Sequence, residues 1–595
     1  MNQGVSVETI VGDGDLGFAA AANRAAASAR GEYLLVMSGA SGVRAGWLEA
    51  LVELADLRHD VGGVASRVIL EDGTLLEAGS VIWRDGSTYR VGRGEPPDSR
   101  RYHYLRQVDC ASPTSLLIRH STFRAVGGFD EQLGPTAATV DLCLSIRRRR
   151  QRMFLEPHSV VIRPREIDDN EGDDFLARRG TALLCEKWST ELERFAEPAP
   201  RDPTAVALAI HRARHNPRRL LMLDDRVPNQ GAGAGAPRML EVTRELANAG
   251  FAVAFYPTVT HSGDRRDLET VGVEVIDGDL ISHLAAPHTL YDVVIVSRPH
   301  NFKLVRRIRR YQGQAAVIYD AEALAFRRIE RQAEFLATVE PEAAKLTKAE
   351  AARTRQLEES VVRGVDRAVA LSAVEAELLR SVVGHCPVDL IEPRAPANNR
   401  MTPRPFAGRS GILLVAGWSE PYPSPNSDGL EWFVEQVLPL VKQRVPWVRL
   451  SVTGANPSPE VLRLAGPSVR FLGHVKDLRD VYDGARVAVE PVRYGAGVKN
   501  KAVEALQHGV PLVASSVGAE GIEGDDGSAV AICDDPERFA AQVIALLDDR
   551  WAWEAARAAI ARLHDYWASR PPHSWADTVE SALIEKTIGR QARHG

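Results

Sequence analysis

The sequence is poor in cysteine, in long apolar runs and in excess positive charge, and each shortage excludes a class of protein. The five cysteines form no CxxC pair, so neither a structural zinc site nor a disulfide framework is indicated. The sequence has no run of about 18 apolar residues, which a membrane-spanning helix needs. The formal net charge of -6 argues against a dedicated nucleic-acid-binding protein.

What the chain does contain is typical of globular protein. It has 595 residues, 45% of them hydrophobic and 26% charged. That is enough to build cores in about three to five domains. The first residues, MNQGVSVETIVGDGD, lack a signal-peptide pattern, so the cytosol is the expected compartment.

Short β-branched segments such as YLLVM, DVVIVS and GILLVAG alternate with amphipathic segments along most of the chain. This rhythm predicts an α/β protein with mostly parallel sheets. Two proline-rich stretches are typical of linkers. We expect a first domain at 1–197, a linker at 198–217, Rossmann-like domains at 218–392 and 409–570 with a linker at 393–408 between them, and a helical tail at 571–595.

The densest chemical signal follows the predicted strand ARVAVEPV. Gly495 and Gly497 stand just before a helix that is expected to begin near Lys499. Small residues let backbone N–H groups approach a ligand, and a helix N-terminus favours an anion. Lys499 and Lys501 suit a diphosphate, and Glu504 in the same helix can accept hydrogen bonds from a ribose. Local spacing alone leaves open a glycine-rich turn with solvated lysines.

The segment PVRYGAGVKNKAVEALQHGVPLVASSVGAEGI, preceded by GWSEPYPSPNSDGLEWFVEQVLPLV, resembles the donor-binding region of family 4 glycosyltransferases. That family has the GT-B fold, in which two Rossmann-like domains face one another. Many members carry two glutamates here. Glu504 matches the second, but the first falls on Ala496. The resemblance therefore implies a ribose contact at Glu504 and a different recognition of the donor sugar.

In the second domain, the loop RVPNQGAGAGAPRM follows the strand LLMLDD. GAGAG after a strand suggests dinucleotide binding. However, Pro228 and the long loop spoil the tight turn, and the strand FAVAFYP does not end in an acid that could bind a ribose. A dehydrogenase is therefore disfavoured. The loop resembles instead the first loop of family 4 enzymes, which implies that Gly233, Gly235 and Arg238 contact the donor.

Arg298 and His300 follow the strand DVVIVS, at the edge where open α/β sheets bind ligands. A lone histidine is more often structural, and it is the resemblance that implies that His300 faces the reaction centre. The segments YDVVIVSRPHNF and VIYDAEALAFRRIERQAEF also match the family.

The first domain resembles a family 2 glycosyltransferase, which has the GT-A fold, on segments such as EDGTLLEAGSVIWRDG and LLIRHSTFRAVGGFDEQLG. The acids of that family are missing. Those that would hold a divalent metal fall on Ser38 and Ala40, and those that would supply a base fall on Ala138 and Thr139, leaving only Asp141. The opening strand of that fold is also expected to be absent. We therefore expect a truncated, degenerate domain that folds without transferring sugar.

Two basic clusters, within 147–152 and 306–310, fall on expected helices. Most such runs are solvated helix faces. The alternative is docking to anionic lipid headgroups, at roughly 1 kcal/mol per basic residue. Such docking would suit an enzyme whose acceptor is linked to a lipid.

These features together predict an α/β protein with a partial GT-A-like domain followed by a GT-B unit. We expect a bacterial hexosyltransferase that moves sugar from a nucleotide-sugar donor to a glycan or lipid-linked acceptor in cell-surface polysaccharide biosynthesis. The resemblance implies retention of configuration, no metal and no cofactor, in the cytoplasm or peripherally at the inner face of the membrane. The expected catalytic residues are Lys499, Arg493 and His300, and the expected donor-binding residues are Gly233, Gly235, Arg238, Gly495, Gly497, Lys501 and Glu504.

Two other classes of function stay open. One is a non-catalytic scaffold that positions other glycosyltransferases, and the other is a nucleotide-sugar epimerase on the same fold. No nucleic-acid partner is expected.

Overall fold

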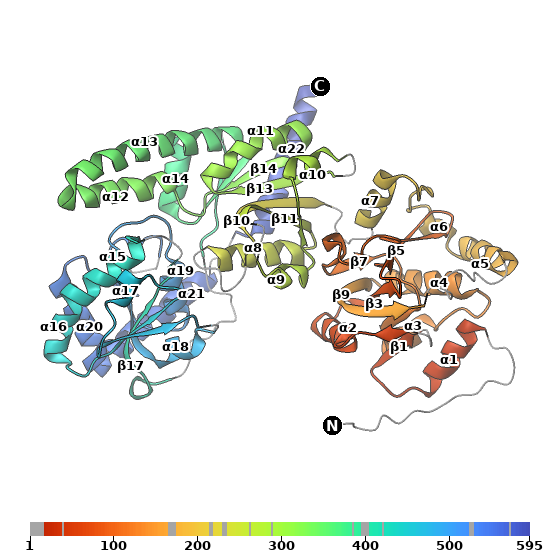
Figure 1. Cartoon of the computed structure of the whole chain (residues 1–595), viewed down its shortest axis with the longest axis horizontal. Coiled ribbons are helices and arrows are strands. Elements are labelled where there is room, and N and C mark those ends of the chain that lie inside the picture. Colours follow the sequence, from red (N-terminus) through yellow and green to blue (C-terminus); the bar gives the residue numbers. More distant parts are fainter. Residues whose placement is uncertain are drawn as a thin grey trace. The chain divides into compact units, whose positions relative to one another are not determined.

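A computed structural model describes residues 17–37, 41–164, 174–212, 218–228, 235–260, 263–286, 289–382, 386–393, 404–418, 422–475, 477–522, 529–569 and 573–594. The chain divides into two compact units, residues 1–220 with 246–256 and 265–290, and residues 221–245, 257–264 and 291–595 (Figure 1). Within the described ranges, no helix combines the length and the apolar character needed to cross a membrane.

The first unit is built on a mixed sheet with the order β1-β8-β3-β9-β2, to which β4 and β7 add at β3 and β9. The β3–β9 pair is parallel, and the other described neighbours are antiparallel. The expectation of mostly parallel sheets is therefore wrong for this part of the chain. The strands are β1 (Tyr33–Met37), β2 (Gly42–Val43), β3 (Val61–Leu70), β4 (Leu75–Glu77), β7 (Arg106–Val108), β8 (Ser115–Arg119) and β9 (Arg152–Arg163), and β5 (Ser80–Ile82) pairs with β6 (Thr88–Arg90).

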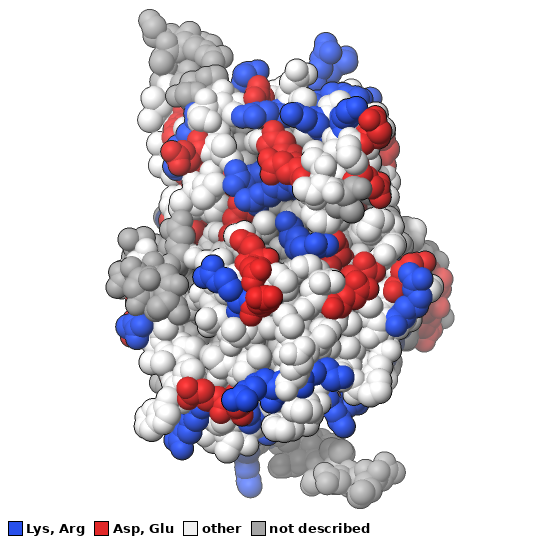
Figure 2. All heavy atoms as spheres, turned by 90° about the vertical axis from the view of Figure 1, so that its left-hand side faces the viewer, with Lys and Arg blue, Asp and Glu red and all other residues white. Residues whose placement is uncertain are grey.

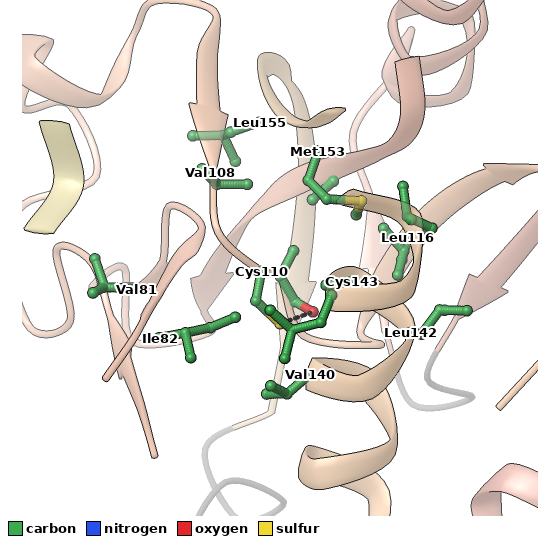
Figure 3. Close-up of a cluster of buried hydrophobic side chains, with 14 of the residues drawn as sticks. Val81, Ile82, Val108, Cys110, Leu116, Val140, Leu142, Cys143, Met153 and Leu155 are labelled. Atoms are coloured by element: carbon green, nitrogen blue, oxygen red, sulfur yellow. Dashed lines mark hydrogen bonds between the residues drawn. The ribbon is translucent and has the colours of Figure 1, made fainter. Parts of the chain in front are cut away.

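The core of the first unit lies between this sheet and helix α4 (Pro135–Arg148). Figure 3 shows Val140, Leu142 and Cys143 of α4 beside sheet residues such as Leu116 and Met153. Each of these side chains is at most 1% exposed, so the apolar pattern of this segment is used for packing. All five cysteines are free thiols.

The other helices of the first unit are α1 (Phe18–Ser28), α2 (Trp47–Leu57), α3 (His120–Val126), α5 (Asp174–Lys187), α6 (Ser189–Leu192), α7 (Pro203–Arg212), α9 (Arg266–Glu269) and α10 (Leu280–Ala285). Helix α7 falls within the expected linker 198–217. Its Val206 and Ala209 join the core of the first sheet, because the segment TAVALAI carries an apolar face. Residues 265–290 also belong to this unit, and a backbone hydrogen bond joins them to its first part. The N–H of Leu105 donates to the carbonyl of Glu269 at 2.8 Å.

The second sheet has the order β12-β11-β10-β13-β14-β15-β16. The pair β11–β12 and the run β13–β14–β15–β16 are parallel. Register places Ser297 level with Asp320, so the residues that follow β13 and β14 leave the sheet at one edge. The strands are β10 (Arg219–Arg226), β11 (Ala252–Thr260), β12 (Glu274–Val275), β13 (Val293–Ser297), β14 (Ala316–Asp320), β15 (Arg367–Ala370) and β16 (Val388–Leu390), with helices α8 (Ala236–Asn248), α11 (Val305–Tyr311), α12 (Ala325–Val339), α13 (Pro341–Gly364) and α14 (Ala373–Val382).

The third sheet, β19-β18-β17-β20-β21-β22, is parallel throughout. Ile412 and Leu414 lie in one buried cluster and Leu413 in another, so both faces of β17 are covered by packed side chains. The strands are β17 (Ser410–Val415), β18 (Leu450–Thr453), β19 (Val469–Gly473), β20 (Ala485–Glu490), β21 (Leu512–Ala514) and β22 (Val530–Ile532), with helices α15 (Pro425–Trp432), α16 (Leu438–Arg444), α17 (Pro459–Leu462), α18 (Arg479–Gly484), α19 (Asn500–Gln507), α20 (Pro536–Asp548) and α21 (Arg550–Ser569).

The last helix, α22 (Trp575–His594), covers the expected helical tail and contacts β13 and β14 of the second sheet. Thr578 donates to Asp389 at 2.8 Å, and Lys586 pairs with Asp366 at 3.1 Å. The tail thus returns from the third domain and packs against the second. The expected α/β class and its two Rossmann-like domains are confirmed, whereas the GT-A likeness of the first domain stays a prediction.

Charges of both signs are interspersed over much of the face drawn in Figure 2. Several members of the two basic clusters have acidic partners. Arg148 pairs with Glu191 at 3.3 Å, and Arg309 pairs with Asp366 at 2.8 Å. These arginines therefore serve at least in part as structural charges, and membrane docking stays a prediction.

Candidate functional site

The loop between β20 and α19 carries the glycines that the sequence singled out. Gly495 and Gly497 have φ angles of +144° and +75°, which side chains with a Cβ rarely adopt. A Cβ on Gly497 would lie 2.8 Å from the Cβ of Ala323, which belongs to the loop after β14. The loop 495–499, called here the donor loop, is therefore glycine-rich because its backbone turns tightly and passes close to the second domain.

Lys499 caps the start of α19 with its ammonium group folded over the donor loop. The Nζ atom donates to the carbonyl oxygens of Gly497 at 2.6 Å and Ala496 at 3.4 Å. Burial lowers the pKa of Lys499 to about 8, although the nearby carboxylates of Glu520 and Glu490 favour the charged form. These hydrogen bonds run to neutral carbonyls, so the ammonium group is a desolvated charge beside a helix N-terminus.

Lys501 has a different environment although it is only two residues away. Its ammonium group pairs with Glu490 at 3.1 Å and donates to the side-chain oxygen of Asn426. Glu490 ends β20 and its side chain is 3% exposed. Burial raises the pKa of Glu490, and the charge of Lys501 opposes that shift. Lys501 therefore neutralises a buried acid under the donor loop.

Glu504 lies one turn further along α19 and is half-buried. Its carboxylate accepts a hydrogen bond from the hydroxyl of Tyr482 at 3.1 Å. Burial raises the pKa of Glu504. The structure thus holds Glu504 in a fixed orientation, and the ribose contact that the resemblance implies stays a prediction.

Arg493 precedes the donor loop and is bound by Asp428. Its Nε donates to Asp428 at 2.9 Å, and a second bond joins the same two groups. The guanidinium lies over the ring of Phe335, 4.7 Å from the centroid, and Phe335 in turn stacks on Tyr494 at 5.4 Å. The expected catalytic role of Arg493 is untested, and its present contacts orient it through an acid and an aromatic ring.

The edge of the second sheet at which β13 and β14 end carries a cluster of charged side chains. The Nε of Arg298 donates to Asp224 at 2.6 Å, and the same guanidinium lies 3.4 Å from Asp225 and 3.2 Å from Glu322. Arg298 and Glu322 both have positive φ angles, +68° and +52°, which are strained for residues with a side chain. Burial raises the pKa of Glu322 to about 7. Strained backbone and desolvated charge of this kind concentrate at functional sites.

His300 lies at the exposed end of this cluster. Its Nε2 is 2.7 Å from Asp225, which also accepts a hydrogen bond from Asn301 at 3.1 Å. Burial disfavours the charge of Asp225, but the bond from His300, the charge of Arg298 and the bond from Asn301 together lower its pKa. The histidine that the sequence proposed is thus oriented by a carboxylate.

Arg238 of helix α8 and Gly235, which immediately precedes that helix, support this edge. Arg238 forms a fork with Asp320, with N–O distances of 2.8 and 2.9 Å, and both side chains are at most 10% exposed. A Cβ on Gly235, which has φ +87°, would collide with the carboxylate of Glu322. These contacts favour structural roles for both residues, while their expected donor contacts stay untested. Gly233 lies outside the described residues.

The two domains of the second unit meet at a salt-bridge cluster. Arg331 of α12 donates to the carbonyl oxygen of Gly495 at 2.8 Å and forms a fork with Glu520. Arg327, one turn earlier, donates to the same carboxylate at 3.2 Å. Gly495 lies 164 positions after Arg331 in the chain, and Glu520 lies 189 positions after it. The cluster therefore joins α12 to the donor loop through residues that are distant in the sequence.

Sequence reasoning missed this cluster because its partners come from distant segments. It also passed over the acids at or near the carboxyl ends of three strands, namely Asp224 in β10, Asp320 in β14 and Glu490 in β20. The available signal was the position of these acids. Parallel strands place their carboxyl ends along one edge of a sheet, so LDD and IYD predict acids along one edge of the second sheet, and VAVE predicts an acid at the corresponding edge of the third.

The positions expected to have lost catalytic acids in the first domain are packed. Ala138 and Thr139 of α4 are 0% and 2% exposed. Asp141 is buried as well, accepting a hydrogen bond from Trp188 at 2.7 Å and pairing with Lys187 at 2.8 Å. The remaining acid therefore has a structural partner. Ser38 and Ala40 lie outside the described residues.

Among the described residues, no group of three or more His, Cys, Asp and Glu side chains is arranged to hold a metal ion. Several buried acids of the second and third domains are bonded instead to arginine, lysine and backbone N–H groups. Glu358, for example, accepts hydrogen bonds from the N–H groups of Ala325 and Phe326 at the start of α12.

Comparison with known proteins finds a family on the segment that carries this geometry. Residues 412–549 match the family described as glycosyl transferases group 1. The chain is 30% identical over 128 residues to an uncharacterized 44.6 kDa protein in the cps region of Klebsiella pneumoniae, a match that covers 20% of this chain and 33% of that protein. It is 28% identical over 148 residues to the O-antigen biosynthesis protein RfbC of Myxococcus xanthus, covering 24% and 11%.

The chain thus spans a third or less of the length of these curated relatives. Among solved structures, sucrose-phosphate synthase from Thermosynechococcus elongatus matches 63% of this chain and 99% of its own. The sequence identity is 17% and the TM-score is 0.43.

Proposed function

Because residues 412–549 match the glycosyl transferases group 1 family, we propose that this protein transfers a sugar from a nucleotide-sugar donor to a glycan or lipid-linked acceptor. One observation carries the proposal. The matched segment contains the donor loop, where the desolvated ammonium of Lys499 lies beside the start of α19. A diphosphate is the leaving group that such a site suits.

The donor diphosphate would lie against the backbone N–H groups at the start of α19. Its charge would draw the ammonium of Lys499 away from the carbonyl oxygens of Ala496 and Gly497 that it now contacts. Lys501 would add to the positive electrostatic potential at the diphosphate while remaining paired with Glu490. Arg493 would flank the phosphates, and Glu504 would accept hydrogen bonds from the ribose. Negative charge that develops on the leaving diphosphate is thereby stabilised by fixed groups.

The acceptor would lie at the edge of the second sheet, near His300 and Arg298. In the reaction, the bond between the anomeric carbon and the diphosphate oxygen breaks, and a bond from that carbon to the acceptor oxygen forms. The proton of the acceptor hydroxyl passes to the leaving diphosphate. His300, held by Asp225 at 2.7 Å, would orient that hydroxyl. Attack from the face that the diphosphate leaves gives retention of configuration.

The product would belong to a cell-surface polysaccharide. The support is that matched relatives are named for the cps region and for O-antigen biosynthesis. A lipid-linked acceptor would place the enzyme in the cytoplasm, in peripheral contact with the inner face of the membrane. The first domain would fold without transferring sugar, since Ala138 and Thr139 stand where its family carries acids.

The test uses the full chain and a panel of nucleoside diphosphates, UDP, GDP, ADP and dTDP, each with its glucose conjugate. Binding should raise the melting temperature by mass action on the folded state. Conjugates that bind should be hydrolysed slowly and should transfer to an acceptor mixture, releasing nucleoside diphosphate. Chromatography of the products shows whether the released sugar retains its configuration.

The same assay separates the other classes of function. A scaffold would show no shift with any member of the panel, and an epimerase would release an isomerised sugar without an acceptor. Turnover should survive excess EDTA, because positive side chains would take the role of a metal at the diphosphate. Loss of turnover in EDTA with recovery on adding Mg²⁺ or Mn²⁺ would contradict the metal-independent mechanism.

A further inference from the structure

We propose that Arg331 binds the sugar of the donor from across the domain boundary and that Glu520 is the residue that positions it. This inference rests on the proposed function, since it assigns the part of the donor site that the resemblance left unexplained. The family's first glutamate, which would contact the sugar, is replaced by Ala496. Arg331 is the charged side chain bonded to the adjacent residue, Gly495.

The position of Arg331 is fixed by three hydrogen bonds. Its Nη1 donates to the carbonyl of Gly495 at 2.8 Å and to Glu520, and its Nη2 donates to Glu520 at 3.0 Å. The planar guanidinium is thereby held edge-on to a carboxylate, which is the geometry that arginine is suited to. No acceptor is bonded to its Nε–H within the described part of the chain. The side chain is 22% exposed, so a ligand can reach it.

Arg331 and Lys499 bracket the residue that lost its carboxylate. Arg331 donates to the carbonyl on one side of Ala496, and Lys499 donates to the carbonyls of Ala496 and Gly497 on the other. Lys499 lies at the start of α19, where the diphosphate would bind. A sugar extending from that diphosphate past Ala496 therefore meets the guanidinium of Arg331.

The charge balance favours an oxygen ligand at this point. Glu520 is 6% exposed and is the acid that both Arg327 and Arg331 contact. Two guanidinium groups thus share one carboxylate, and the ammonium of Lys499 is close enough to be influenced by the charges of Glu520 and Glu490. A hydroxyl or carboxylate oxygen of the sugar can accept from Arg331, whereas a glutamate at 496 would have accepted from the sugar. The contact has thus changed from acceptor to donor.

The experiment compares binding of a nucleotide-sugar with binding of its nucleoside diphosphate, using the panel member that binds the wild-type chain most tightly. Arg331→Gln should weaken binding of the glucose or glucuronate conjugate by about 10- to 100-fold, the range for a hydrogen bond from a charged group. Binding of the free diphosphate should change by less than about threefold. If Arg331→Gln weakens binding of the glucuronate conjugate more than binding of the glucose conjugate, the donor sugar is acidic. If it weakens binding of both conjugates equally, the donor sugar is neutral.

Three further variants sharpen the test. Glu520→Gln keeps the shape of the side chain but loosens Arg331, so it should weaken the same conjugate in the same direction by a smaller factor. Arg331→Lys keeps the charge without the fork and should not restore full binding. Arg353→Gln changes an exposed arginine on α13 and should match wild type. Circular dichroism and melting temperature establish that each variant is folded.

The outcomes are distinguishable. Equal weakening of the conjugate and the free diphosphate by Arg331→Gln would show that Arg331 merely supports the donor loop, and unchanged binding of both would show that it has no role there. Either result overturns the inference while leaving the proposed function intact. A wild-type chain that binds no member of the panel overturns the proposed function, and this inference with it.

Discussion

Replacing Lys499 by methionine should abolish most turnover without weakening the fold. Methionine keeps the length and apolar stem of lysine but removes the ammonium group. The diphosphate then loses its nearest cation, and removal of one such preorganised group costs about 10²- to 10³-fold in turnover. Binding of the nucleoside diphosphate should weaken in parallel.

The structure also gives the sign of the stability change. Burial lowers the pKa of Lys499 from 10.5 to about 8, which means that the folded state disfavours its charge. At neutral pH this penalty is on the order of 3 kcal/mol, at about 1.36 kcal/mol per pKa unit. Lys499→Met removes the penalty, so the free energy of unfolding should stay equal or rise. A gain in stability with a loss of activity is the expected signature of a functional charge.

Lys501→Met is the matched control on the same helix. Lys501 pairs with Glu490, whose side chain is 3% exposed. Its removal leaves a buried acid without its cation, which should cost a few kcal/mol of stability. The two variants therefore differ in sign although they lie two positions apart. The assays are urea denaturation followed by circular dichroism, and release of nucleoside diphosphate from the donor that the panel identifies.

The reasoning would be refuted if Lys499→Met were less stable than wild type while its turnover stayed within about threefold, a barrier change below about 0.7 kcal/mol. In that case the ammonium group would serve to hold the carbonyls of the donor loop. The function of Lys499 would then be to donate its hydrogen bond to the carbonyl of Gly497 at 2.6 Å, and this bond would persist when the donor binds.

The same contacts give three further expected outcomes. Nucleoside diphosphate binding should weaken above about pH 8, because Lys499, whose pKa burial lowers to that value, loses its charge there; a pH titration of binding should be flat for Lys499→Met. Gly235→Ala should lower the melting temperature, since φ is +87° and the new methyl group collides with Glu322, at a cost of about 1–3 kcal/mol; shortening Glu322 to Ala in the same chain should recover part of the loss. Asp141→Asn should destabilise the first unit, because it removes the charge that Lys187 pairs with at 2.8 Å, yet leave turnover within about twofold; a large loss of turnover in a folded variant would restore a catalytic role to that domain.

The glycine-rich turn at 495–499 could be predicted from the sequence because its signal is local, whereas its role in donor binding stays a prediction. Gly495, Gly497, Lys499 and Lys501 stand within seven consecutive positions, and the backbone geometry that needs glycine is set by neighbours in the chain. The same locality explains why the alternating strands and helices of the second and third domains could be predicted. Parallel sheets of this kind are covered on two faces, so their strands appear as short apolar runs.

The side chains that contact the predicted residues could not be predicted from the local sequence. Arg238 was expected to contact a donor, yet its fork is closed by Asp320, 82 positions away. The guanidinium needs a buried acid because burying an unpaired charge is costly, but the sequence does not say which acid approaches. Lys499 and Lys501 show the same limit. They look equivalent in the sequence, and only the fold separates the one bonded to carbonyls from the one bonded to Glu490.

The mixed sheet of the first unit was mispredicted for a related reason. Strand segments such as YLLVM and SLLIR have the same apolar character whether their neighbours run parallel or antiparallel. Direction is decided by which connection returns each strand, and β1 pairs antiparallel with β8, in which Tyr33 lies opposite Arg119. Short apolar runs therefore predicted the strands of this unit but not their pairing.

Asp141 is a buried acid of the first unit whose presence its contacts explain. The resemblance inferred from the sequence implied acids at positions 138 and 139, but Ala138 and Thr139 stand there and are packed in α4. A buried carboxylate is costly without partners. Asp141 has two partners, the indole N–H of Trp188 and the ammonium of Lys187, so its removal would leave both groups without this acceptor. The residue that looks like a remnant of catalysis is thus explained by the packing of α4 against the end of α5 and the residue that follows it.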